Sequence, residues 1–296
     1  MTARPKVSVI IPTHNHAHFL PECLSSVRAQ TYTDYEVIVV NNGSTDDTES
    51  LIGKLTWDKL RYYFQNDTGS VAGPRNTGIR LARGKYVAFL DSDDLWYEKK
   101  LERVMKVLEN SPDIDILSHD LFLVRNERPK TILKSGPLKK DMFKFILIKN
   151  PLLGSATVVK KSAMIEIGGF DGRRDFIHAE DSDAWLKIAY LGKKFYFINE
   201  ALGEYRVHDN NLSRDFKSVL LNEKNVIVNH FDNLKSKIPL HGYLIYRNRL
   251  CRIYFNMGVQ YFFRKKLIIG LFNIAKAFYL NPFVFLATLV HFFLKM

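Results

Sequence analysis

The first part of the chain alternates short β-branched apolar runs with longer segments that carry apolar residues at helical spacing. Apolar runs of four or five residues are typical of buried strands, and apolar residues three and four positions apart are typical of helices. The predicted strands are 7–11, 36–40, 61–64 and 86–90, and the predicted helices are 17–30, 45–55 and 74–83. This alternation predicts an α/β protein, a three-layer sandwich around a mainly parallel central sheet.

The pattern becomes irregular beyond residue 114 and is largely helical after residue 214. The elements expected in between are a connection at 125–140, helices at 140–149 and 181–191, and strands at 155–159 and 195–198. We therefore expect two domains, an α/β domain at 1–215 and a basic, amphipathic helical region at 216–296.

The positive charge is concentrated in that second region. The chain has 43 basic and 31 acidic residues, a net charge of +12, and residues 217–296 hold 12 of the basic and 2 of the acidic ones. The body is thus nearly neutral and the tail strongly basic. Such a tail should be attracted to an anionic surface, whether membrane, nucleic acid or acidic glycan.

The tail also carries an apolar stretch at 267–294, which Asn281-Pro282 interrupts. Its last uninterrupted part, 283–294, is shorter than the roughly 20 residues that span a bilayer. The polar residues of the stretch fall on one helical stripe opposite a broad apolar face: Lys265, Lys266, Asn273 and Lys276. This favours a helix in a membrane interface. The alternative is an appendage packed on the body with its lysines outward.

Two further features indicate location. Cys23 and Cys251 lie far apart without metal-ligand spacing, so we expect free thiols and a reducing compartment. The N-terminus leads directly into a strand, with no visible signal peptide. Together with the basic tail, this predicts a cytoplasmic protein, peripheral on the inner face of the cytoplasmic membrane.

A cluster of acids at the end of strand 86–90 is the first indication of chemistry. Asp91-Ser92-Asp93-Asp94 places three carboxylates at the carboxyl edge of a strand, where open α/β sheets bind ligands. Carboxylates there suit Mg²⁺ or Mn²⁺ held together with substrate phosphates. The alternative is an acidic turn that caps the next helix.

Several motifs agree with this site in order and spacing. They are Val7-Ser8-Val9-Ile10-Ile11-Pro12-Thr13, Asn42-Gly43-Ser44-Thr45-Asp46, Arg75-Asn76-Thr77-Gly78-Ile79, Asp91-Ser92-Asp93-Asp94, Glu180-Asp181 and Tyr205-Arg206-Val207-His208. In these residues the chain resembles the family 2 glycosyltransferases of the GT-A fold. The resemblance covers roughly residues 5–215 and leaves the tail outside.

The resemblance implies a metal-bound nucleotide diphosphate. Asp93 looks like the ligand of Mn²⁺ or Mg²⁺, and Asp91 looks like the residue that touches the ribose or the metal's water shell. His208 is expected to ligate the metal or donate to phosphate. Asp94 is instead expected to cap the following helix, which contains Leu101 and Val104.

The same resemblance places the nucleotide. The residues expected around it are Pro12, Thr13, His14, Asn42, Arg75 and Arg206. The family often has Asp at the Asn42 position, accepting a hydrogen bond from uracil N3–H. Asn can accept but also donate, so a UDP-sugar is expected while other nucleotides stay open. Arg75 could instead hold the loop, and Arg206 could pair with a structural carboxylate.

Asp181 looks like the general base of an inverting transfer, which takes the proton of the acceptor hydroxyl. Its neighbour Glu180 is expected to orient the acceptor or Asp181. Both acids also suit a helix N-terminus without any catalytic role. Trp185, one turn further on, could stack on an acceptor sugar, but a place in the core is favoured.

These observations lead to one function. We expect an inverting, metal-dependent transferase that adds a single sugar from a nucleotide-diphosphate sugar to a saccharide or lipid-linked acceptor, in bacterial lipopolysaccharide, capsule or exopolysaccharide synthesis. The chain lacks the Gln-x-x-Arg-Trp segment and the long spans of the processive synthases that resemble this domain. The oligomeric state stays open.

Three other classes fit less well. A sugar-phosphate nucleotidyltransferase would need a Gly-rich, basic loop after the first strand, where this chain has Pro12-Thr13-His14-Asn15-His16. A basic nucleic-acid-binding protein would present its aromatic residues on a stacking platform, whereas the tail interleaves them with Leu and Ile. We therefore expect no nucleic-acid partner. A catalytically inactive relative is disfavoured because Asp91, Asp93 and Asp181 are all present.

Overall fold

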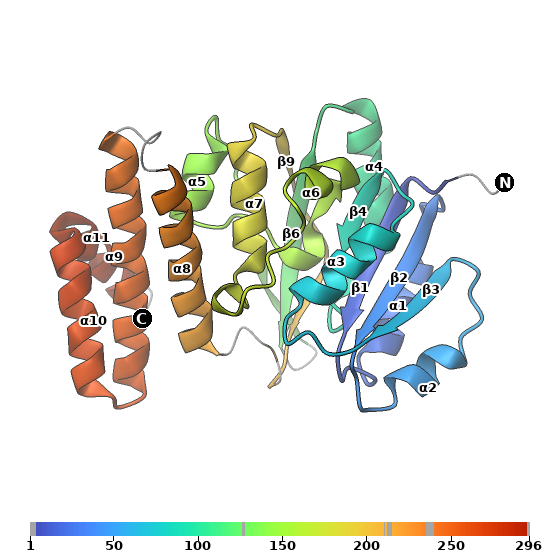
Figure 1. The fold of residues 1–296 in the computed structure, drawn as a ribbon, viewed down its shortest axis with the longest axis horizontal. Helices are drawn as coiled ribbons and strands as arrows, with labels where there is room; N and C mark the ends of the chain where they lie inside the picture. The colour runs from blue at the N-terminus through green and yellow to red at the C-terminus, as the bar shows by residue number, and fades with distance from the viewer. Residues whose placement is uncertain (1–3, 126–127, 210, 212–214, 235–239, 295–296) are drawn as a thin grey trace. The chain divides into compact units, whose positions relative to one another are not determined.

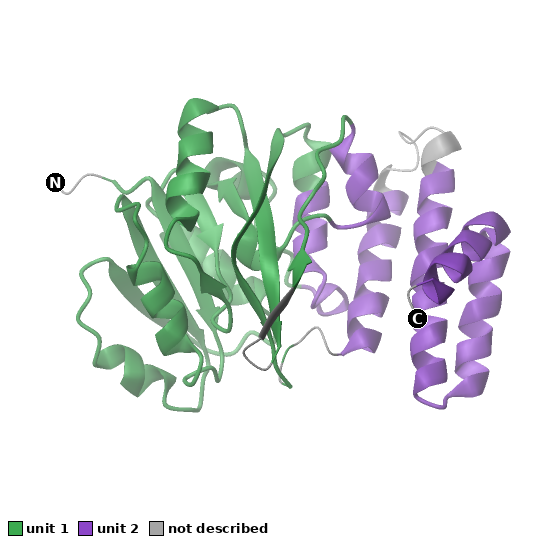
Figure 2. Cartoon of the chain, turned by 180° about the vertical axis from the view of Figure 1, so that it is seen from behind, with its two compact units in different colours: residues 1–140, 151–172, 187–211 green, residues 141–150, 173–186, 212–296 purple. Residues whose placement is uncertain are grey.

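The computed structural model describes residues 4–125, 128–209, 211, 215–234 and 240–294. The chain forms two compact units, which are described separately (Figure 2). Unit 1 contains residues 1–140, 151–172 and 187–211, and unit 2 contains residues 141–150, 173–186 and 212–296. The chain passes from unit 1 to unit 2 for the last time after residue 211, close to the boundary predicted after residue 215. Residues 141–150 and 173–186 also belong to the helical unit 2, which the prediction did not include. Whether 1–215 and 216–296 are independent domains stays a prediction.

Unit 1 contains the sheet (Figure 1). Its strands are β1 (Val7–Thr13), β2 (Tyr35–Asn42), β3 (Leu60–Gln65), β4 (Tyr86–Phe89), β5 (Leu95–Trp96), β6 (Ile116–Arg125), β7 (Arg128–Leu133), β8 (Val158–Lys160) and β9 (Phe195–Val207). Among the described residues the order is β3-β2-β1-β4-β8-β6-β9-β5, with β7 beside β6. The strands β3, β2, β1 and β4 are parallel to one another, as β6 is to β9. The shorter pairings through β5, β7 and β8 are antiparallel.

Helices cover both faces of this sheet. They are α1 (Leu20–Arg28), α2 (Thr48–Gly53), α3 (Ala72–Leu81), α4 (Lys100–Asn110) and α6 (Lys161–Glu166). Alternate residues of β1, such as Val7 and Val9, pack with the buried faces of α1 and α4. Ile10 points to the other face, where α3 approaches so closely that a Cβ on Gly78 would lie 2.4 Å from Ile10 Cγ2. The predicted three-layer α/β sandwich with a mainly parallel sheet is therefore confirmed.

The predicted elements of the first 90 residues are all present, but the second half of the sheet is larger than expected. Strand β6 was missed because buried polar residues, His119 and Asp120, interrupt its apolar run. The expected connection at 125–140 contains β7, which pairs with β6. Strand β9 continues from the predicted 195–198 to Val207 and so carries the last motif on a strand.

Unit 2 is helical. It contains α5 (Met142–Ile148), a 3₁₀ turn η2 (Arg174–Phe176), the first seven residues of α7 (Glu180–Tyr190), α8 (Phe216–Leu234), α9 (Leu240–Phe263), α10 (Leu267–Leu280) and α11 (Pro282–Phe293). Cys251, Phe255 and Ala277 form a small core among the last three helices. The predicted break is confirmed, because the Asn281 side chain accepts hydrogen bonds from the backbone N–H groups of Phe283 and Val284 and caps α11. Both cysteines of the chain are buried free thiols, as expected.

The orientation of α10 corrects the predicted polar stripe. Asn273 is 6% exposed and lies on the inner face with Gly270 and Ala277. Small residues on this face let α10 approach α9, where a Cβ on Gly258 would lie 2.7 Å from the side chain of Ile274. Consequently large apolar side chains point outward, among them Ile268 at 84% exposure. None of the helices in the described residues combines the length and apolar character needed to cross a bilayer.

One buried cation in unit 1 gives a stability prediction. Lys100 is fully buried, and its Nζ has no hydrogen-bond partner among the described residues but lies 3.4 Å from the centre of the Trp96 ring. Burial lowers the pKa of Lys100 well below its usual value, and the Trp96 face offsets only part of the lost hydration. Burial thus disfavours the charged form of Lys100 in the folded state, which costs stability at every pH where the unfolded lysine is charged.

We expect Lys100→Met to raise the free energy of unfolding by about 1–3 kcal/mol at pH 7, on the scale of an uncompensated buried polar group. The gain should shrink as the pH rises above about 10, where the unfolded lysine is neutral too. Urea unfolding at several pH values measures this. Lys99→Met, at an exposed neighbour on the same turn, should change stability by less than about 0.5 kcal/mol. A destabilised Lys100→Met protein would show that Lys100 makes a net favourable contribution.

Candidate active site

The motifs of unit 1 meet at the carboxyl edge of its parallel strands. Thr13, at the end of β1, pairs in register with Asn41 at the end of β2, and Asp91 follows β4 on the other side of β1. The ring Nδ1 of His14 lies 2.8 Å from the backbone carbonyl of Asn42. Pro12 and Thr13 are buried between the neighbouring strands. Loops from three strands therefore form one site, as the sequence predicted for an α/β sheet.

Asp93 is the centre of a potential metal site. Its Oδ2 lies 2.9 Å from Nε2 of His208, which follows β9. Asn211 Nδ2 donates to the same carboxylate oxygen at 3.3 Å and lies 3.1 Å from the His208 Nε2. The structure thus brings together the two predicted metal ligands, which are about 115 residues apart in the sequence.

His16 is a third member of this cluster that sequence reasoning missed. One ligand atom each from His16, Asp93 and His208 lies within 4.8 Å of the other two, the sole such group of three among the described residues. Burial lowers the pKa of His16, which favours the neutral imidazole that metals bind. A lone histidine in a loop gave no signal, because its partners come from distant strands.

These groups suit a divalent metal. A carboxylate and imidazoles are ordinary ligands of Mn²⁺ and of other divalent transition metals. Two ligands at right angles around a metal, with bonds of about 2.1 Å, lie about 3.0 Å apart. Asp93 Oδ2 and His208 Nε2, at 2.9 Å, already have that spacing.

Asp91 lies beside this cluster and is fixed by Arg75. The guanidinium Nη2 of Arg75 donates to Asp91 Oδ1 at 2.7 Å, and the Asp91 N–H donates to Ser155 Oγ at 3.1 Å. Arg75 is 6% exposed, so this ion pair is largely shielded from water. The pair supports the interpretation in which Arg75 holds the loop, and it leaves the second oxygen of Asp91 for a ligand.

Asp94 does not cap the following helix, which corrects the prediction. Helix α4 begins at Lys100 with Lys99 at its N-cap, whereas Asp94 is buried and accepts hydrogen bonds from Ser155 Oγ and from the backbone N–H of Arg206. Burial, followed by the charges of Asp93 and Asp91, raises the pKa of Asp94 well above its usual value. Its role is to join the acidic turn to β9, which brings His208 to Asp93.

Arg206 reinforces the same connection. Its guanidinium donates to the backbone carbonyl of Asp93, pairs with Glu22 of α1, and lies 5.0 Å from the centre of the Phe19 ring. This agrees with the structural-carboxylate interpretation of Arg206. A direct contact of this side chain with the nucleotide stays a prediction.

The Asn42 side chain is engaged within the loops at the ends of β2 and β3. Its Oδ1 accepts from Gln65 Nε2 at 2.8 Å and from the Thr68 N–H at 3.2 Å, and its Nδ2 donates to Asp67 Oδ1 at 2.8 Å. Gly43 is in the left-handed region, with φ of 75°, and a Cβ there would lie 2.7 Å from Asp67 N. These bonds hold the loops that follow β2 and β3 in one conformation.

The predicted catalytic base lies in unit 2. Asp181, in the first turn of α7, accepts hydrogen bonds from Asn150 Nδ2 at 3.2 Å and from the Ser182 N–H at 2.6 Å. Asp183 is fully buried, and its Oδ1 forms a 2.8 Å hydrogen bond with Nε2 of His230. This bond fixes the first turn of α7 against α8. No local pattern in the sequence indicates the Asp183–His230 pair or Asn150.

The two other predicted residues of α7 are buried. Glu180 is 4% exposed and Trp185 is 1% exposed. The burial of Trp185 agrees with the favoured core interpretation and leaves its ring no open face for an acceptor sugar. The role of Glu180 beside Asp181 stays a prediction.

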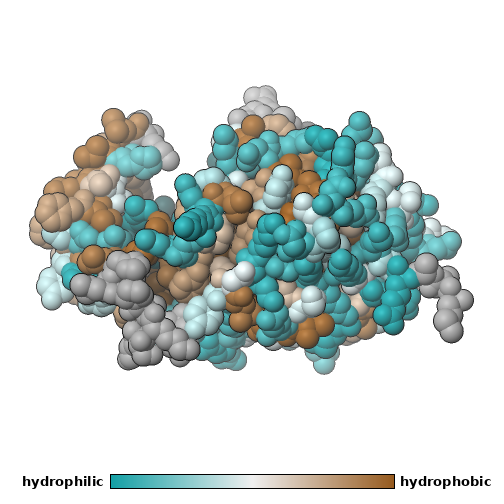
Figure 3. Space-filling view, turned by 90° about the horizontal axis from the view of Figure 1, so that it is seen from above, coloured by the Kyte–Doolittle hydropathy of each residue, from teal (hydrophilic) through white to brown (hydrophobic). Residues whose placement is uncertain are grey.

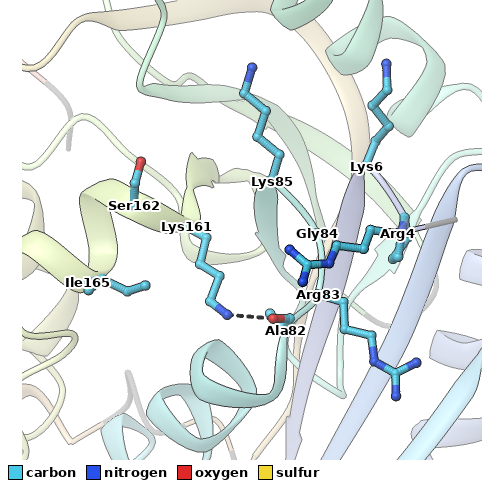
Figure 4. Close-up of a pocket in the computed structure, with 10 residues that line it drawn as sticks. Arg4, Lys6, Ala82, Arg83, Gly84, Lys85, Lys161, Ser162 and Ile165 are labelled. Carbon is cyan, nitrogen blue, oxygen red and sulfur yellow. Dashed lines mark hydrogen bonds between the residues drawn. The ribbon is translucent and has the colours of Figure 1, made fainter.

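A hollow of about 770 Å³ lies elsewhere on unit 1 (Figure 4). Basic side chains surround it: Arg4, Lys6, Arg83, Lys85 and Lys161. Lys6 and Lys85 precede β1 and β4, so this hollow lies at the amino ends of these strands. The carboxylates described above lie at the opposite edge, and we do not assign the donor to this hollow.

Comparisons with known proteins identify the family. The profile of Glycosyl transferase family 2 matches residues 8–168. An uncharacterized glycosyltransferase of Rickettsia typhi is 32% identical over 219 residues, 70% of this chain and 66% of that protein. The chain accordingly belongs to glycosyl transferase family 2. Several relatives are longer, and the chain spans only about 30% of a homologue in Rickettsia felis.

Two further proteins have named donors. The Escherichia coli UDP-Glc:alpha-D-GlcNAc-diphosphoundecaprenol beta-1,3-glucosyltransferase WfgD is 27% identical over 260 residues, 84% of this chain and 90% of that protein. The mannosyltransferase PcManGT of Pyrobaculum calidifontis, solved with GDP-Man and Mn²⁺, matches 98% of this chain and 80% of that chain, with a TM-score of 0.64 and 21% identity. The fold is therefore the predicted GT-A fold.

Proposed function

We propose that the protein is an inverting, metal-dependent glycosyltransferase that transfers one sugar from a nucleotide-diphosphate sugar. The observation that carries the proposal is the Asp93–His208 pair, with Asp91 fixed beside it, at the carboxyl edge of the sheet. Anionic and imidazole ligands at that edge are what a metal-bound diphosphate needs. The named donors of WfgD and PcManGT support a nucleotide-sugar.

Asp93 and His208 would hold Mn²⁺ or Mg²⁺, and the bound ion would neutralise the diphosphate that departs. Asp91 is free on one oxygen to accept from a ribose hydroxyl or a metal-bound water. Thr13 and His14 line the start of the nucleotide site, and Asn42 holds the loop at its base end. Asp181 takes the proton from the acceptor hydroxyl as that oxygen attacks the sugar carbon from the face opposite the leaving group.

The donor is best described as a UDP-sugar. The relative WfgD uses UDP-Glc, and the family resemblance implies uridine, but Asn42 stands where the family often has the Asp that binds uracil. The Asn42 side chain already forms hydrogen bonds within the protein, through its oxygen with Gln65 and through its nitrogen with Asp67. It therefore differs from an Asp at this position, whose carboxylate could accept a hydrogen bond from the base. A direct screen is therefore needed. Calorimetric titration of UDP-, GDP-, dTDP- and CMP-sugars with Mn²⁺ should identify one class that binds, and binding by none would contradict the proposal.

The acceptor is a saccharide or a lipid-linked saccharide of a bacterial surface glycan, at the inner face of the cytoplasmic membrane. The printed acceptor of WfgD, a diphosphoundecaprenol glycan, supports this class. The surface of the C-terminal helices supports the membrane part (Figure 3). Ile268 and Phe272 of α10 and Phe283 of α11 expose 84%, 66% and 83% of their area, and Lys265 and Lys266 are exposed where α10 begins. Apolar side chains next to lysines suit an anionic lipid surface.

We expect the full-length protein to co-sediment with anionic liposomes more than with neutral ones. Two double variants separate the causes. Ile268→Ser with Phe272→Ser should lose the binding that survives high salt, because burial of apolar side chains is not screened. Lys265→Gln with Lys266→Gln should lose the preference for anionic lipid, at about 1 kcal/mol per lysine. If the wild-type protein does not bind, or if all variants bind equally, the helices are a packing or dimerisation element.

A further inference from the structure

We propose that His16 is a third protein ligand of the metal, and that the resulting pair of imidazoles makes the site select a transition metal such as Mn²⁺ or Co²⁺ over Mg²⁺. The proposal rests on the proposed function of the Asp93 site, but it concerns metal identity and can be tested without a donor or an acceptor.

His16, Asp93 and His208 have the arrangement that a shared metal requires. His16 lies in the turn between β1 and α1, His208 follows β9 and Asp93 follows β4, so three separate segments bring their side chains to one point. Their ligand atoms are within 4.8 Å of one another. Opposite ligands around a metal with bonds of about 2.1 Å lie about 4.2 Å apart, so the longest of the three separations, at most 4.8 Å, would close by at most about 0.6 Å. The His16 and His208 rings are perpendicular, with centroids 5.9 Å apart.

Ser92 fixes the orientation of the His16 ring. The Ser92 hydroxyl lies 2.8 Å from His16 Nδ1, and Ser92 is buried. Metal-bound histidines commonly donate their other ring N–H to an oxygen, which fixes the tautomer and the ring orientation. With Nδ1 engaged in this way, Nε2 keeps the lone pair, and no described hydrogen bond uses His16 Nε2.

The chemistry of the three ligands gives the selectivity. Imidazole nitrogen binds Zn²⁺ or Co²⁺ more strongly than Mn²⁺, and it suits Mg²⁺ least, because Mg²⁺ prefers oxygen ligands and retains its waters. A site with one carboxylate and one imidazole would discriminate weakly among these ions. A second imidazole should therefore raise the affinity for Co²⁺ and Mn²⁺ without helping Mg²⁺.

Equilibrium dialysis of the full-length protein with Mn²⁺, Co²⁺ or Mg²⁺ alone tests this. We expect His16→Gln to weaken Co²⁺ and Mn²⁺ binding by about 10- to 100-fold, no less than the loss of an outer-shell partner. Mg²⁺ binding should change by less than about threefold. His18→Gln is the matched control, because His18 is an exposed imidazole two residues away. It should bind every ion as the wild type does.

A spectroscopic measurement separates ligation from a structural effect of the mutation. Pulsed electron paramagnetic resonance of bound Mn²⁺ detects nitrogen atoms coordinated to the metal. The wild type should show two imidazole nitrogens, and His16→Gln should show one. If the variant keeps the wild-type spectrum and affinities, His16 is not a ligand. If no ion binds the wild type without nucleotide, the spectra are recorded with Mn²⁺ and UDP together. The same difference, two nitrogens in the wild type and one in His16→Gln, then decides whether His16 is a ligand. Failure of the donor screen with an intact two-nitrogen signal would contradict only the proposed function.

Discussion

Asp93→Ala should abolish metal-dependent binding of the nucleotide-sugar while the protein stays folded. Asp93 is the sole carboxylate in the His16–Asp93–His208 cluster, so its removal leaves only neutral ligands for a divalent cation beside a diphosphate. Its main structural contacts, with His208 and Asn211, are partly exposed side-chain hydrogen bonds, whereas Asp94 carries the bonds to β9. Calorimetric titration with donor and Mn²⁺ measures the loss, and thermal unfolding checks the fold.

Two controls make this experiment decisive. Asp93→Asn keeps the shape of the side chain but removes its charge, so it too should lose most of the metal affinity. Asp113→Ala removes an exposed carboxylate that pairs with Lys194, and it should bind the donor normally. Unchanged donor affinity in Asp93→Ala would rule out the metal assignment.

Asp181→Asn should bind the donor nearly as the wild type does but lose turnover by roughly 10²–10⁴-fold, the usual scale of general acid–base catalysis. The amide can still accept from Asn150 through its oxygen, so the first turn of α7 keeps its structure. It cannot take the acceptor proton. Single-turnover kinetics with the acceptor measure the effect, and Asp175→Asn, at an exposed acid in the preceding 3₁₀ turn, should keep full turnover. Near-normal turnover in Asp181→Asn would exclude it as the base.

Local patterns in the sequence were sufficient for the first half of the fold. Strands β1, β2 and β4 are continuous apolar runs that end in polar turns, so both their position and the residues at their carboxyl ends could be predicted. Strand β6 could not, because the buried residues His119 and Asp120 interrupt its apolar run. Asp120 is accommodated by a partner distant in the sequence, Ser135, whose N–H donates to Asp120 Oδ1 at 2.8 Å. Such compensation is invisible in a local pattern.

The site residues likewise include some that local motifs indicate and others that depend on contacts distant in the sequence. Asp91, Asp93 and His208 stand in recognisable motifs, and the structure places them together. His16 lacks a motif and gains its place only because β9 brings His208 to the turn after β1. Asp94 was assigned to a helix cap from its position alone, but its partners are Ser155 and Arg206, distant in the sequence. In α10 the wheel placed Asn273 on one polar stripe with Lys276, but Asn273 packs inward with Gly270 and Ala277 while Lys276 stays exposed, because small residues, not charge, decide which face packs inward.

The most direct test of the central claim is metal-dependent cleavage of a nucleotide-sugar by the full-length protein. Without an acceptor, water can take the place of the attacking hydroxyl, so we expect slow hydrolysis of the bound donor. A panel of UDP-, GDP-, dTDP- and CMP-sugars should yield one donor that releases its nucleotide with Mn²⁺, with release abolished by a chelator and in Asp93→Ala. Absence of both binding and release for every donor, with and without acceptor glycans, would contradict the assignment of this chain as a metal-dependent glycosyltransferase.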